Sequence, residues 1–116
     1  MMNKHLLSLI KATQYSISGL RCLIKERAFF QEIALFPAVL VILYVFDLSM
    51  KSYLVFSYVL ILITEALNTC IECTVDRIST EPHELSKKAK DIGSAAVFIA
   101  ILHFSIMFLL AIFGIL

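Results

Sequence analysis

Residues 53–75 read YLVFSYVLILITEALNTCIECTV, an apolar run that contains no Lys or Arg. Such a run can cross a bilayer as a helix, because a span needs about 20 mainly apolar residues. The composition agrees, since 60% of the 116 residues are hydrophobic and 16% are charged, against roughly one half and one quarter in soluble proteins. A soluble chain this short could not bury so much apolar surface, whereas lipid accepts it. The sequence therefore predicts an integral membrane protein.

Further apolar segments lie on both sides of this run. The segment before it contains Pro37, which a membrane helix tolerates, and the segment after it is long enough to span alone. Near the N-terminus, Leu and Ile recur every three or four residues between polar side chains, which is typical of an amphipathic helix on the membrane surface. We expect a single all-α membrane domain over residues 1–116, with a surface helix at about 4–24 and transmembrane helices at about 27–46, 53–75 and 92–116.

The one strongly polar segment, residues 76–91, predicts an aqueous loop. Of the Lys and Arg residues, only Lys51 lies outside this segment and the N-terminal part of the chain. Positive residues collect on the cytoplasmic side of membrane proteins. We therefore expect the N-terminus and the 76–91 loop to be cytoplasmic, and the Asp47–Ser52 loop to be external.

Four polar residues follow one another on the central run: Glu65, Asn68, Glu72 and Asp76. Their spacing of three, four and four places them on one face of a helix, with Glu65 about 16 Å deeper than Asp76 at about 1.5 Å per residue. A carboxyl group at that depth indicates function by default. For Glu65 alone, a protonated or subunit-joining carboxyl is an equal alternative, but four polar residues on one stripe favour function, because helix pairing does not require stacked negative charges.

Stacked carboxylates need a positive partner. The candidates are Lys90, Arg77, Arg21 and a divalent cation, and an oxygen-only ligand set suits Mg²⁺, which also bridges nucleotide phosphates. None of the three glycines belongs to a phosphate-binding loop, so lysines and metal would have to hold the phosphates. His103, alone among apolar residues, is expected to be a hydrogen-bonded packing residue, and Tyr58 is expected to pack as well.

At these residues the sequence resembles the prokaryotic diacylglycerol kinases, which are small membrane-embedded enzymes. The resemblance covers nearly the whole chain. It rests on 65–72 (EALNTCIE), 75–78 (VDRI), 83–86 (HELS) and 89–97 (AKDIGSAAV), with upstream matches at Lys11-Ala12, Tyr15-Ser16, 19–21 (GLR), Glu26 and 30–32 (FQE).

The resemblance implies a homotrimer in which neighbouring subunits share active sites near the cytoplasmic face of the bacterial inner membrane. It implies transfer of the γ-phosphate of ATP to the primary hydroxyl of diacylglycerol, with Mg²⁺ as cofactor, membrane lipids as surroundings and no nucleic-acid partner. Glu65 resembles the general base, and Glu26 and Glu72 resemble metal ligands that also contact the nucleotide. Further nucleotide positions are Tyr15, Glu81, Pro82, His83, Lys90 and Asp91; substrate positions besides Glu65 are Arg21, Gln31, Glu32, Asn68 and Ser94; Asp76 supports the site.

The chain departs from the family pattern at three places. Ser8 stands where close relatives have arginine, Pro82 replaces a tyrosine, and the external loop is slightly shorter, so individual substrate contacts differ while the carboxylate stripe is intact. An undecaprenol kinase of the same family is the nearest alternative. An alternative of another class is a small cation-coupled transporter, in which one buried Glu would bind proton and substrate in turn.

Overall fold

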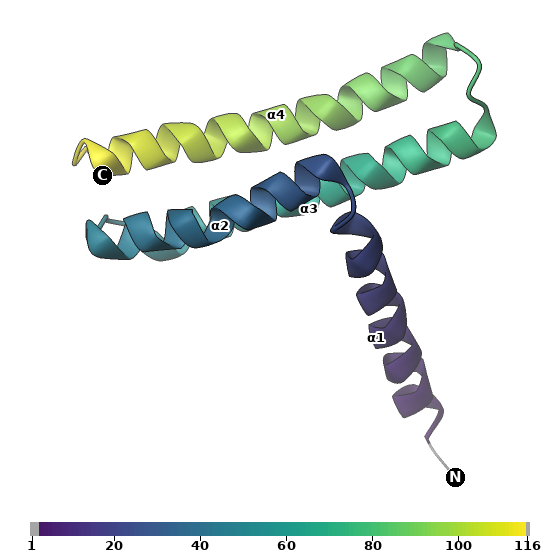
Figure 1. Cartoon of the computed structure of the whole chain (residues 1–116), viewed down its shortest axis with the longest axis horizontal. Coiled ribbons are helices and arrows are strands. Elements are labelled where there is room, and N and C mark those ends of the chain that lie inside the picture. Colours follow the sequence, from purple (N-terminus) through teal and green to yellow (C-terminus); the bar gives the residue numbers. More distant parts are fainter. Residues whose placement is uncertain (1–2, 116) are drawn as a thin grey trace.

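The chain folds into four α-helices. The computed structural model describes residues 3–115, and this part contains α1 (Lys4–Leu23), α2 (Arg27–Val45), α3 (Lys51–Ile78) and α4 (Glu84–Ile112), with no strand (Figure 1). Three of the helices, α2, α3 and α4, are long and apolar enough to cross a membrane. The predicted all-α membrane fold is therefore confirmed. The last residue of the expected 92–116 span lies outside the described residues.

Helix α1 points away from the other three helices (Figure 1) and buries none of its residues. Asn3 caps its start, because the Asn3 side chain accepts a hydrogen bond of 3.2 Å from the backbone N–H of His5 and so satisfies a free donor of the first turn. Its apolar side chains, among them Ile10, Ile17 and Leu20, are exposed. This helix therefore retains a free apolar face, as the predicted surface helix requires.

Helix α3 is the centre of the bundle, since both α2 and α4 pack against it. The core residues are Leu43 of α2, Leu54, Tyr58 and Ile61 of α3, and Phe104 and Ala111 of α4. The two ends of the bundle carry different connections between helices (Figure 1). We call the end with the α2–α3 turn the turn end, and the end where residues 79–83 join α3 to α4 the connection end.

The predicted 76–91 loop was too long. Helix α3 continues to Ile78 and α4 begins at Glu84, because charged side chains are compatible with a helix that extends beyond an apolar span. The start of α4 is well capped: His83 Nδ1 accepts a 3.2 Å hydrogen bond from the Leu85 N–H, and Glu84 in the first turn complements the helix dipole. Of the predicted 76–91 loop, residues 79–83 are the part that lies outside the helices.

The turn end is tight and carries its own polar contacts. Asp47 and Met50 adopt positive φ angles of 48° and 57°, and Asp47 forms an ion pair with Lys51, which holds the pKa of this carboxyl below its usual range. Nearby, a 2.9 Å hydrogen bond joins Tyr53 Oη of α3 to His103 Nε2 of α4. The expectation that His103 is a hydrogen-bonded packing residue agrees with this contact.

Candidate functional site

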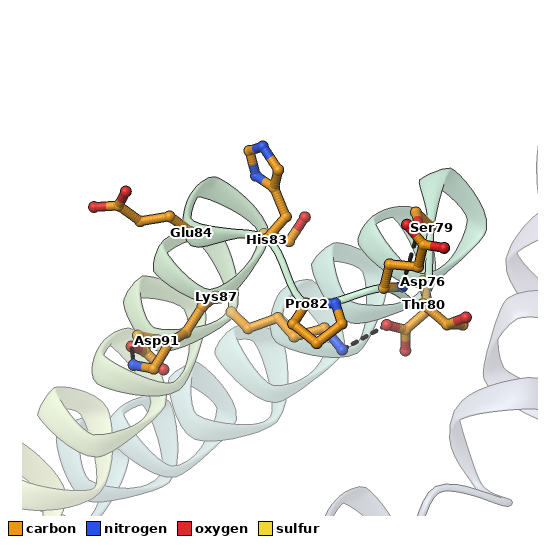
Figure 2. Close-up of a pocket in the computed structure, with 11 residues that line it drawn as sticks. Asp76, Ser79, Thr80, Pro82, His83, Glu84, Lys87 and Asp91 are labelled. Atoms are coloured by element: carbon orange, nitrogen blue, oxygen red, sulfur yellow. Dashed lines mark hydrogen bonds and ion pairs between the residues drawn. The ribbon is translucent and has the colours of Figure 1, made fainter.

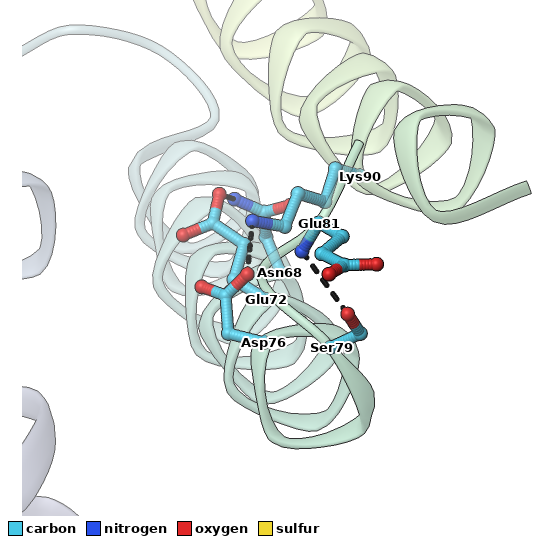
Figure 3. A network of polar contacts seen from close by, with 6 residues as sticks. All are labelled: Asn68, Glu72, Asp76, Ser79, Glu81 and Lys90. Atoms are coloured by element: carbon cyan, nitrogen blue, oxygen red, sulfur yellow. Dashed lines mark hydrogen bonds and ion pairs between the residues drawn. The ribbon is translucent and has the colours of Figure 1, made fainter. Parts of the chain in front are cut away.

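The polar stripe of α3 runs from the bundle interior to its surface at the connection end. Glu65 and Asn68 are each 8% exposed, whereas the side chain of Asp76 is 52% exposed. Asn68 Nδ2 donates a 3.1 Å hydrogen bond to Glu72 Oε1, so these two side chains share a face as their spacing predicts (Figure 3). The stripe therefore links a buried carboxyl group to solvent-accessible ones.

Lys90 supplies the positive charge that the stripe needs. Its Nζ reaches from α4 to Asp76 Oδ1 at 2.5 Å (Figure 3). Of the three basic residues proposed from sequence, it is the one that forms an ion pair within residues 3–115. Since both partners are partly exposed, the pair adds little to stability. Its effect is to place an ammonium group beside the exposed end of the stripe.

Gly93 allows α4 to approach the stripe closely. A Cβ atom at this position would lie 2.4 Å from Asn68 Oδ1 and 3.4 Å from Ile71 Cδ1. Asn68 Oδ1 is buried and has no hydrogen-bond partner within the described chain. From the sequence, Gly93 belongs to a motif shared with the family but has no predicted role. The sequence could have indicated the close approach at Gly93, because a glycine in a membrane span often marks close helix packing.

Helix α2 contributes a second carboxyl group, that of Glu32. Its Oε2 atom is buried without a hydrogen-bond partner among residues 3–115. An ionised carboxylate that is buried without a partner is costly. Glu32 therefore offers an unsatisfied acceptor that a hydrogen-bond donor would satisfy.

A cavity of about 640 Å³ opens at the connection end (Figure 2). Its lining brings together five positions that the sequence analysis assigned to nucleotide contact: Glu81, Pro82, His83, Lys90 and Asp91. Asp76 lines it too, so the cavity adjoins the exposed end of the stripe. Lys87 also lines the cavity and pairs with Asp91 at 2.5 Å. The lining carries four carboxyl groups and two lysines, and both lysines are paired with Asp residues. The volume is large enough to admit phosphate groups.

Three other predicted site residues lie apart from the stripe. Tyr15 and Arg21 belong to α1, and Glu26 is the N-terminal cap position of α2. No hydrogen bond or ion pair joins any of them to the stripe within residues 3–115. Ser94 follows Gly93 on α4 and is exposed, as is Gln31 on α2. One copy of the chain therefore assembles part of the predicted residue set.

The carboxylate side chains of the site provide oxygen ligands, which suit a hard cation such as Mg²⁺. The described residues contain no group of three or more His, Cys, Asp or Glu side chains arranged to hold a metal. Mg²⁺, however, commonly takes only one or two carboxylates and completes its shell with water and phosphate oxygens. Glu72 offers such a carboxylate, of which Oε1 is engaged by Asn68.

Comparison with known proteins gives a consistent result. The family model described as prokaryotic diacylglycerol kinase matches residues 14–113. A diacylglycerol kinase of Escherichia coli K12 is 48% identical over 97 residues, which cover 81% of this chain and 80% of that protein. The Pseudomonas aeruginosa diacylglycerol kinase is 41% identical over 96 residues (80% and 78% covered). The Helicobacter pylori diacylglycerol kinase is 37% identical over 102 residues (85% and 80% covered).

Proposed function

The chain belongs to the prokaryotic diacylglycerol kinase family, and we propose that it transfers the γ-phosphoryl group of ATP to the primary hydroxyl of diacylglycerol, giving phosphatidate. The observation that carries the proposal is the continuous polar stripe from Glu65 to the cavity at the connection end. A lipid hydroxyl that stays in the bilayer and a nucleotide that stays in water would meet along this stripe.

Glu65 is the proposed general base. It is the buried carboxylate of the stripe, so it can approach a hydroxyl group from within the helix bundle. A base must lie within hydrogen-bonding reach of the proton that it accepts, and a carboxylate on a spanning helix meets this requirement for a substrate held in the membrane. The buried Glu32 carboxyl group, whose Oε2 atom has no hydrogen-bond partner within the described residues, would lie beside the lipid head.

The phosphates of ATP would lie in the cavity at the connection end, where Lys90 and His83 are among the lining residues. Phosphoryl transfer depends mainly on positioning and charge neutralisation. Glu72, with Glu26, would hold Mg²⁺, which when bound would neutralise phosphate charge. The ion pair between Lys90 and Asp76 would keep the ammonium group close to the phosphates before transfer.

A homotrimer with shared active sites would account for the predicted residues that one chain leaves apart. Tyr15 and Arg21 on α1 and the cap residue Glu26 lack contacts to the stripe within residues 3–115, and α1 points away from its own bundle (Figure 1). In a trimer these residues would complete the site of a neighbouring subunit. The distribution of Lys and Arg supports an inner-membrane protein with a cytoplasmic N-terminus and connection end.

The test is a direct assay of lipid phosphorylation. Purified protein in mixed micelles is offered diacylglycerol or undecaprenol with labelled ATP and Mg²⁺, and phosphate incorporated into each lipid is measured, with Glu65→Gln as the matched inactive control. We expect phosphatidate as the main product. Preferential labelling of undecaprenol would reassign the substrate within the family. A protein that consumes no ATP with either lipid would favour a transporter instead.

A further inference from the structure

Tyr58 lies where the three spanning helices meet. It belongs to α3 and is 5% exposed. Its ring lies 5.1 Å from that of Phe36 on α2 and 5.1 Å from that of Phe104 on α4, the latter in an edge-to-face arrangement. The sequence predicts only packing at this position. Packing alone would be served equally by a phenylalanine, so the hydroxyl group needs a separate explanation.

The Tyr58 hydroxyl forms a hydrogen bond to another helix. Its Oη donates to the backbone carbonyl oxygen of Glu32 at 2.6 Å. Pro37 follows within α2, and a proline removes a backbone donor and weakens the helix ladder around it. The hydroxyl therefore fixes the α2 backbone to α3 just before the point where α2 is intrinsically least rigid.

The segment that this hydrogen bond holds carries a buried carboxyl group. Glu32 provides the backbone carbonyl oxygen that Tyr58 contacts, and its side-chain Oε2 is buried without a partner among the described residues. Tyr58 precedes Glu65 by two turns on the same face of α3. The hydroxyl group of Tyr58 thus fixes the axial position and rotation of α2 relative to α3, the helix that carries Glu65.

We propose that Tyr58 is a positioning residue for lipid phosphorylation: its hydroxyl fixes α2 so that the Glu32 carboxyl group keeps its place against α3, the helix that carries Glu65, and meets the lipid head. This inference rests on the proposed function. It predicts that loss of the hydroxyl impairs use of the lipid and not use of the nucleotide. The cavity at the connection end is lined without α2, and Glu26, the α2 cap residue assigned to the metal, lies about 9 Å along the chain before the carbonyl group that the hydroxyl holds.

The experiment compares two tyrosines of the same helix. Tyr58→Phe removes the hydrogen bond to α2 and keeps the ring. Tyr53→Phe is the matched control, since it removes the hydrogen bond from Tyr53 to His103 of α4 at the turn end and leaves Ser57 Oγ 3.5 Å from the same His103 nitrogen. For Tyr58→Phe we expect kcat/KM for diacylglycerol to fall by about 3- to 10-fold, the loss that one hydrogen bond implies, with KM for ATP unchanged. For Tyr53→Phe we expect both parameters to match the wild type.

A double-mutant cycle tests the route through Glu32. In a Glu32→Gln background, Tyr58→Phe should cost less than about twofold, because interacting residues are non-additive. Four results would each overturn the inference. Tyr58→Phe could show wild-type kinetics with the lipid, or an equal loss of kcat/KM for ATP. Tyr53→Phe could show an equal loss of kcat/KM for the lipid, or the two substitutions in the cycle could be fully additive. Failure of Tyr58→Phe to assemble would also overturn it, since the hydroxyl would then be structural. A wild-type protein inactive on diacylglycerol would instead reject the proposed function, and this inference with it.

Discussion

Replacing Gly93 with alanine tests whether the close approach of α4 to the stripe matters for the reaction. The added Cβ would lie 2.4 Å from Asn68 Oδ1, so something has to move. The amide is the end of a side chain and moves more easily than α4. We therefore expect Asn68 to turn away, which breaks its 3.1 Å hydrogen bond to Glu72 and displaces a proposed metal ligand.

The structure predicts that stability and activity respond differently. Overpacking costs about 1–3 kcal/mol, but alanine in place of glycine inside a helix recovers about 1 kcal/mol. The net loss of stability is then about 0–2 kcal/mol. The lost hydrogen bond is worth about 0.5–1.5 kcal/mol, which corresponds to a fall in kcat of about 2- to 10-fold if the bond supports the reacting geometry.

The assay measures kcat, the Mg²⁺ dependence of the rate and the thermal unfolding midpoint on one preparation. Gly19→Ala is the matched control, because Gly19 also lies in a helix but a Cβ there would have no atom within 4 Å. In an Asn68→Ala background the added methyl group of Gly93→Ala finds space, so it should have little further effect on kcat. An equal effect of Gly93→Ala in both backgrounds, or a wild-type kcat in the single variant, would refute this account.

Three further predictions concern the proposed site. Glu65→Gln keeps size but cannot accept the hydroxyl proton, so kcat should fall by at least about 100-fold with modest change in ATP affinity and no loss of assembly. Glu72→Gln removes the charge that a hard cation requires, so Mg²⁺-dependent activity should be abolished or greatly weakened in a protein that still assembles. In a variant without native cysteines, an impermeant thiol reagent on intact cells should label a cysteine placed at Ser49 and not one placed at Ser79.

Each of these has a clear contrary outcome. A well-assembled Glu65→Gln protein that retains most of its kcat removes Glu65 from the role of base. An unchanged rate and Mg²⁺ dependence in Glu72→Gln remove that residue from the metal site. Labelling at position 79 rather than 49 inverts the predicted topology.

The spanning helices could be predicted because apolar length alone identifies them. The shared face of Asn68 and Glu72 could also be predicted, since it depends only on the rotation of one helix. The positions at which α3 ends and α4 begins at the connection end could not be predicted. Polarity showed where the bilayer ends, but a helix such as α3 or α4 can continue into water while its caps are satisfied.

Contacts between helices were harder to predict. The pairs Asp76–Lys90 and Tyr58–Glu32 depend on which faces of two helices meet. A soluble helix reveals this face by its apolar stripe, whereas a helix in lipid is apolar on nearly all sides. Lys90 was therefore one of several candidates, and the hydroxyl of Tyr58 was overlooked.

The polar contacts between α3 and α4 have a consequence for helix register. They lie at the two ends of the helix pair. Tyr53 and Ser57 contact His103 at the turn end, and Asp76 pairs with Lys90 at the connection end. Tyr53 and Asp76 are about 34 Å apart along α3 at about 1.5 Å per residue. The apolar side chains between them provide little register information, because lipid is as good a neighbour as another aliphatic side chain. A slip of one helical turn, about 5.4 Å, would separate all of these polar contacts at once. Aliphatic residues between the contacts can therefore be exchanged for others of similar volume while the alignment of Gly93 with Asn68 is preserved.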